Sequence, residues 1–213
     1  MMRHAVSNEL YAYWRALRKG RAPPERNEIE PGAIRSVLAD TFVLHFDAHA
    51  GFPFRISGSN VNAVFLKELR GVPFLEIWRE SDRGRVRSIL ETAADEEAPV
   101  VLLAEARPAG LAPVEVEVAL LPLRHQGATH ARMLGSLTAG AGADWLGLIG
   151  SGPAALVGWR RLEDAATGAG PRAHPPARLG LAVSTDDRRG NDEVQTLTSI
   201  RLRPAAKRFH LST

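Results

Sequence analysis

The sequence predicts an α+β fold, and three observations support this prediction. Two β-prone segments are followed by two helical segments and then by three more β-prone segments. No strand–helix–strand unit repeats, which argues against a doubly wound nucleotide-binding fold. Val114, Val116, Val118 and Leu120 alternate with Glu115, Glu117 and Ala119, which is typical of a strand in an antiparallel sheet. At roughly 150 residues per domain, a length of 213 residues predicts one domain with an appendage.

The chain begins with a predicted amphipathic helix over residues 6–18. Its apolar side chains recur at spacings of three and four residues: Val6, Leu10, Tyr13, Trp14 and Leu17. Gly20 ends this helix, and the pair Pro23-Pro24 excludes helix from the linker that follows. A short helix over residues 31–39 is expected next, with Ile34, Val37 and Leu38 on one side.

The middle of the chain predicts a hairpin and two helices. Residues 41–47 and 52–57 are rich in β-branched and aromatic side chains around a short turn that contains Gly51. A helix starting near Ser59 carries Val61, Val64, Phe65 and Glu68 on one face and stops at Gly71. Trp78 then lies in a loop, and a second helix covers residues 81–96.

Three strands are expected over residues 100–106, 114–121 and 132–138, separated by turn residues. In the second strand the valines alternate with Glu115 and Glu117, which predicts one buried and one solvated face. Charged residues on a solvated face need no catalytic explanation, and the sequence contains no G-x-S-x-G motif. These residues therefore do not indicate a catalytic site.

The chain beyond residue 140 is rich in Gly, Ala and Pro. Residues 133–159 carry few charges, but they include Asp144, Pro153 and seven glycines, which argues against a membrane-spanning helix. The predicted division is an N-terminal helix and linker over residues 1–30, a domain over 31–162, and a flexible or partly β extension over 163–213.

Several segments carry a family resemblance. The stretches YAYWRALRKGRAPPERNEIEP, LADTFVLHF, FRISGSNVN, ELRGVPFLEIW and LGSLT occur in this order and resemble the single-domain PAS-like family of bacterial regulators. The resemblance covers about residues 8–140. It implies the PAS sensor fold, with a five-stranded antiparallel sheet flanked by helices and a pocket or core between them. It also implies a role in signalling without catalysis.

No cofactor follows from the resemblance. Haem-binding PAS domains use a histidine on a helix, and residues 81–96 contain none. Flavin photoreceptors need a reactive cysteine, and the chain has no cysteine. His45 and His49 could share a strand face, but no third ligand lies at metal spacing, so no metal site is expected.

The predicted ligand site lies between the helices and the sheet. Seven side chains are expected to line this space, as ordinary core or as a cavity wall: Phe65, Phe74, Trp78, Val101, Leu103, Val116 and Val118. Arg55 lies inside an apolar strand, where a guanidinium would pair with Glu68 or with a ligand carboxylate or phosphate unless it faces solvent. The candidate ligand-binding residues are thus Arg55, Phe65, Glu68, Phe74, Trp78, Val101 and Val116.

These observations predict a cytoplasmic sensory or adaptor module that binds a small ligand or a signalling protein. The first residues lack a secretory signal, which favours the cytoplasm. A homodimer is expected through Leu10, Tyr13, Trp14 and Leu17, although part of this stripe could instead cover the chain's own sheet. The alternative is a nucleic-acid-associated regulator, because residues 158–213 have a charge balance of +4 against −1 for residues 1–157.

Overall fold

The computed structural model describes residues 2–162. The predictions for the C-terminal extension, residues 163–213, and for its arginine-rich segments lie outside the described residues. In the described part, no helix is long and apolar enough to cross a membrane.

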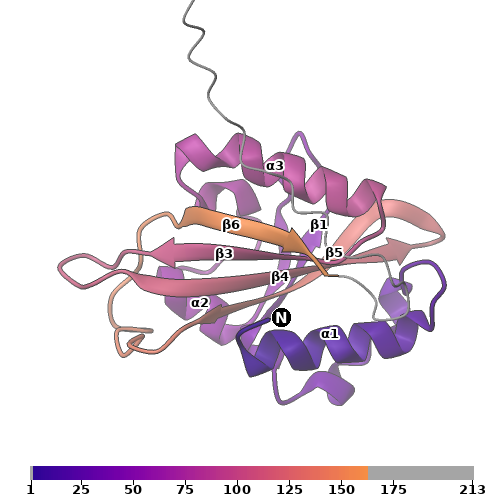
Figure 1. Cartoon of the computed structure of the whole chain (residues 1–213), viewed down its shortest axis with the longest axis horizontal. Helices are drawn as coiled ribbons and strands as arrows, with labels where there is room; N and C mark the ends of the chain where they lie inside the picture. Colours follow the sequence, from indigo (N-terminus) through magenta and orange to yellow (C-terminus); the bar gives the residue numbers. More distant parts are fainter. Residues whose placement is uncertain (1, 163–213) are drawn as a thin grey trace, which may run out of the picture. The chain divides into compact units, whose positions relative to one another are not determined.

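One antiparallel sheet forms the centre of the fold (Figure 1). Its strands lie in the order β2-β1-β5-β4-β3-β6. The strands are β1 Thr41–His45, β2 Phe54–Ser57, β3 Val100–Ala106, β4 Val114–His125, β5 Ala128–Ala139 and β6 Ala155–Arg161. The α+β class is confirmed, but the sheet has one strand more than expected, because β6 pairs with the free edge of β3.

Helices cover both faces of this sheet. On one face, α2 (Ser59–Phe65) and α3 (Glu80–Asp95) bury their apolar side chains with those of the strands, and we call this side of the sheet the α2/α3 face. On the other, α1 (Ala5–Arg18) packs Leu10 and Trp14 against β4 and β5. Figure 1 shows α1 and α3 on opposite sides of the sheet.

Strand β4 is buried on both faces. Val116, Val118 and Leu120 point to the α2/α3 face, whereas Leu121 and Leu123 pack under α1. The expectation that one face of this strand is solvated is therefore wrong, because α1 covers it.

The first residues of the chain anchor α1 to the sheet through Glu117. This side chain is 3% exposed, and its two carboxylate oxygens accept the backbone N–H groups of Arg3 at 2.7 Å and His4 at 3.2 Å. A carboxylate beside the N-terminus of a helix also stabilises the helix, because its negative charge interacts favourably with the positive end of the helix dipole. Glu117 thus has a structural role rather than the solvated place expected from the sequence.

Two short helical segments differ from expectation. Residues 31–39 form two 3-10 turns, Pro31–Ile34 and Leu38–Asp40, instead of one helix, and Leu38 is 37% exposed. Helix α2 ends at Phe65 rather than near Gly71, because Leu66 adopts a left-handed conformation with φ +49°. Glu68 is consequently outside the helix.

Two glycines allow close contacts in the fold, and both lie in segments that carry the family resemblance. A Cβ on Gly58 would lie 2.2 Å from the carbonyl oxygen of Ala39, and one on Gly135 would lie 2.2 Å from the Phe42 ring. These glycines let the end of β2 approach the turn before β1 and let the Phe42 ring approach the backbone of β5.

Candidate functional site

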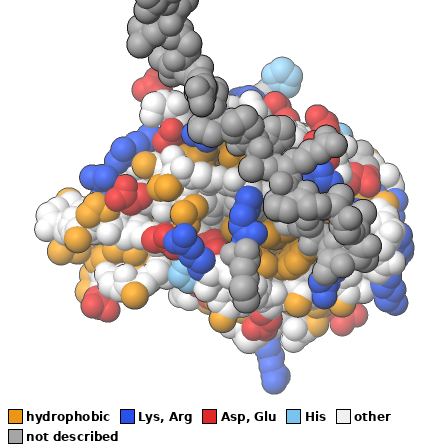
Figure 2. Space-filling model, in the orientation of Figure 1, with side chains coloured by type: hydrophobic (Ala, Val, Ile, Leu, Met, Phe, Trp, Pro, Cys, Tyr) orange, Lys and Arg blue, Asp and Glu red, His pale blue; other side chains and the backbone are white. Residues whose placement is uncertain are grey.

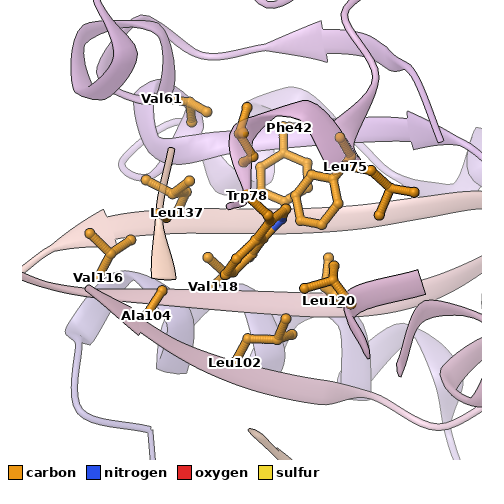
Figure 3. Packing of buried hydrophobic residues seen from close by; sticks show 14 of the residues in the cluster. Phe42, Val61, Leu75, Trp78, Leu102, Ala104, Val116, Val118, Leu120 and Leu137 are labelled. Atoms are coloured by element: carbon orange, nitrogen blue, oxygen red, sulfur yellow. The ribbon is translucent and has the colours of Figure 1, made fainter. Parts of the chain in front are cut away.

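The centre of the α2/α3 face is occupied by Trp78. A short 3-10 helix, Phe74–Ile77, ends at Trp78 and places its indole over the sheet. The indole is fully buried and meets the Phe74 ring edge-on, with 5.8 Å between ring centroids. Figure 3 shows the indole between Phe42 and strand β4, which carries Val118 and Leu120.

The indole N–H of Trp78 is buried without a partner. Its Nε1 atom has no hydrogen-bond acceptor among the described residues. A buried donor left unpaired costs about 1–3 kcal/mol, and such groups are rare in native proteins. Trp145, in the same cluster, also has an indole N–H without an acceptor among the described residues, so this core contains two unpaired indole donors.

The structure brings most of the expected lining residues together. Phe74, Trp78, Val116 and Val118 belong to one buried cluster, and Phe65 packs against its margin while partly buried. The cluster also contains residues outside the predicted lining set, among them Phe42, Phe54, Leu102 and Ala104. The strand alternation could have identified Phe42 and Phe54, because side chains two residues apart lie on the same face of a strand. Leu44 and Phe52, two residues away, belong to the same buried cluster.

The expectation that Val101 and Leu103 face the helices is wrong. Val101 packs with Met2, Ala119 and Leu162 on the opposite face. Leu102 and Ala104 take the positions on the α2/α3 face instead. Val101 does not share a space with Trp78.

Arg55 also lies outside the α2/α3 core. The pairing of β1 with β2 shifts register between Val43 and Leu44, so Phe54 points inward while Arg55 and Ile56 are both exposed. Arg55 forms no ion pair with the described residues. The proposed partner Glu68 is exposed and instead accepts hydrogen bonds from Ser57 Oγ at 3.3 Å and Asn62 Nδ2 at 3.2 Å.

Arg55 belongs to a group of positive charges at the end of β1. Burial of the His45 ring, together with the nearby charges of Arg132 and Arg55, lowers the pKa of His45 below its ordinary value of 6.5, although Asp47 opposes this effect. Burial and the charge of Arg55 likewise lower the pKa of Arg132. The neutral form of His45 is therefore favoured in the folded chain.

We predict that His45→Gln flattens the dependence of stability on pH below neutrality. As the pH falls below about 6.5, the unfolded chain binds a proton at His45 before the folded chain does, so stability falls with falling pH. This single proton contributes a slope of at most about 1.4 kcal/mol per pH unit, which ends below the lowered folded pKa. Urea unfolding of both proteins at several pH values measures the difference, and parallel curves would contradict the prediction.

Within residues 2–162, no group of three His, Asp or Glu side chains is placed to hold a metal ion.

Comparison with known proteins identifies the family. The PAS domain family model matches residues 2–138. The matched segment runs from just before α1 nearly to the end of β5 and omits β6. The chain belongs to the PAS domain family. The match includes α1, so the helix that covers the second face of the sheet is part of the family's pattern.

Among solved structures, this PAS domain is similar to the LOV protein of Rhodobacter sphaeroides. The sequence identity is 11%, the TM-score is 0.40, and the alignment covers 50% of this chain and 61% of that chain. The chain therefore matches less than two thirds of that protein's length. No match is found among curated proteins.

Proposed function

We propose that this PAS domain is a sensory or adaptor module that changes its contacts with a protein partner when a small molecule occupies the α2/α3 core. The module does not catalyse a reaction in this proposal. The unpaired indole N–H of Trp78, at the centre of that core, supports the proposal most directly. A ligand with a carbonyl, ether or similar oxygen would accept a hydrogen bond from this N–H group.

The packing of the core suggests how occupancy would be transmitted. Phe42, Phe74 and Trp78 fill the space over the sheet at no more than 1% exposure. A ligand would have to displace one of these side chains. Because close-packed interiors transmit strain, this displacement would move α2, α3 or the segment that carries Trp78.

Native mass spectrometry of the freshly purified full chain tests the ligand. A bound compound appears as added mass that is lost on denaturation, and Trp78→Phe should lower its occupancy because it removes the N–H. In parallel, the indole N–H signal of Trp78 in a nitrogen–proton correlation spectrum should move downfield when it gains an acceptor. Trp14, whose N–H is already bonded to Pro122, and the exposed Trp159 provide internal references. An unmodified mass with an unchanged Trp78 signal would contradict the ligand.

The protein partner includes a second copy of the chain in this proposal. Leu10 and Trp14 are fully buried against the chain's own sheet, so the expectation that they form the dimer interface is wrong. Tyr13 and Leu17 are partly buried and remain candidates. Where Figure 2 shows described residues, acidic and basic side chains are interspersed with apolar ones. The proposal also includes a cytoplasmic location, which cell fractionation tests.

A further inference from the structure

A second candidate site lies outside the core, between α3 and the turn that joins β1 to β2. Here an open surface pocket of about 290 Å³ is lined by three elements. The turn contributes His49, Ala50 and Gly51, the segment after α2 contributes Pro73 and Leu75, and α3 contributes Arg83, Gly84 and Arg87. We call it the arginine pocket.

The two arginines of this pocket are held in place by backbone carbonyl groups. Arg83 Nε donates to the carbonyl oxygen of Trp78 at 3.2 Å, and Arg87 Nη1 donates to the carbonyl oxygen of Ala48. The Arg87 guanidinium also lies 5.6 Å from the centre of the Phe52 ring, within the range of a cation–π contact. Both guanidinium groups are therefore positioned before any ligand binds.

No ion pair with a described residue holds either arginine of the pocket, Arg83 or Arg87. None of the lining residues is acidic. The nearest acidic residue along the turn is Asp47, and its Oδ1 accepts the backbone N–H of Ala50 at 3.0 Å. Each guanidinium thus keeps N–H donors that no described acceptor uses.

Gly84 leaves room between the two arginines. It lies one residue after Arg83 on the exposed side of α3, and a Cβ added there would meet no atom within 4 Å. Arg83 and Arg87 are four residues apart, so their side chains lie on the same side of the helix, one turn apart. Leu75 and Pro73 add an apolar surface beside them.

We propose that the arginine pocket binds a small organic phosphate, separately from any ligand of the core. A phosphate dianion offers three oxygens that can accept hydrogen bonds from two guanidinium groups, and arginine matches phosphate geometry. The exposed ring of His49 would add a donor, and the apolar wall would contact the organic part. The volume is near the lower end of the range for ligand pockets, which fits a small ligand.

Phosphorus NMR titration with phenyl phosphate tests this proposal on the full chain. We expect a saturable shift of the phosphorus signal. Benzoate, whose carboxylate carries a single negative charge, should displace phenyl phosphate only weakly in a competition titration. Arg83→Gln and Arg87→Gln should each weaken binding about 10-fold or more, because hydrogen bonds between charged groups are lost. Arg85→Gln is the matched control, since Arg85 is exposed on the same helix and does not line the pocket.

Gly84→Leu separates loss of the site from loss of the fold. Leucine has a higher helix propensity than glycine and would project into open space, so the variant should be at least as stable while its side chain blocks the pocket. Weaker binding by this stable variant would support the proposal. No saturable shift with wild type, or equal affinity in the Arg83, Arg85 and Arg87 variants, would overturn it. Neither result depends on whether the Trp78 core holds a ligand.

Discussion

Replacement of Trp78 by alanine is expected to lower the free energy of unfolding by about 3–5 kcal/mol, the range for large aromatic truncations in cores. The indole is fully buried at the centre of the α2/α3 face, where it touches the Phe74 ring and lies beside Phe42, as Figure 3 shows. Alanine would leave a cavity that the surrounding strands can close only in part. For a domain of this size the expected fall in melting temperature is about 6–20 °C.

Trp159→Ala is the matched control for this experiment. Trp159 lies on the edge strand β6 and is 37% exposed, so its truncation should cost much less than that of Trp78. Urea unfolding of the two variants and the wild type gives the comparison. Equal losses in the two variants would show that Trp78 does not hold the core together.

A third variant, Trp78→Phe, isolates the unpaired N–H. Phenylalanine keeps an aromatic ring but removes the buried donor, so the loss of ring volume is offset by removal of a group that costs about 1–3 kcal/mol when unpaired. In ligand-free protein we expect this variant to be far more stable than Trp78→Ala. A loss as large as that of the alanine variant would mean that the N–H already has an acceptor.

The order of elements was predictable from the sequence because each has a clear local signal. The helical spacing in residues 6–18, the hairpin around Gly51 and the alternation in residues 114–121 correspond to α1, to β1 with β2, and to β4. Strand β6 was harder to predict, because ALVGWRR contains one β-branched residue and a glycine. Its pairing with the free edge of β3 is a long-range contact that no local pattern reveals.

The faces of the strands were less predictable than their positions. Residues 100–104 read VVLLA, and a strand buried on both faces shows no alternation from which parity could be taken. The face on which Val101 lies could be assigned only from the structure, in which Met2 and Leu162 pack against it. Similarly, a register shift between Val43 and Leu44 exposes both Arg55 and Ile56, and such a shift changes which face each following residue occupies.

No local sequence pattern indicates the arginine pocket. Its residues come from the turn at 49–51, the segment at 73–75 and α3, and only the fold brings them together. Arg83 and Arg87 have the spacing of an ordinary solvated helix face. Their distinguishing features are the carbonyl oxygens of Trp78 and Ala48 that orient them, and these contacts exist only in the folded chain.

Trp14→Ala is expected to destabilise the chain by about 3–5 kcal/mol, because the side chain belongs to the core under α1. Trp14 is fully buried, and its Nε1 donates to the carbonyl oxygen of Pro122 at 2.8 Å. Alanine would remove the ring and leave that carbonyl without this donor, which adds to the loss. Arg15→Ala, a truncation on the exposed side of the same helix, should change stability by no more than about 0.5 kcal/mol.

This substitution also decides between the two roles that the sequence allows for the α1 stripe. If Trp14 served a dimer interface, the variant would remain folded at nearly the wild-type melting temperature and light scattering would report a monomer. If Trp14 covers the chain's own sheet, the melting temperature falls at every protein concentration, whatever the oligomeric state of the wild type. We expect the second result, since α1 is bonded to β4 just before its start, where Glu117 accepts two backbone N–H groups, and within its second half, where Trp14 donates to Pro122.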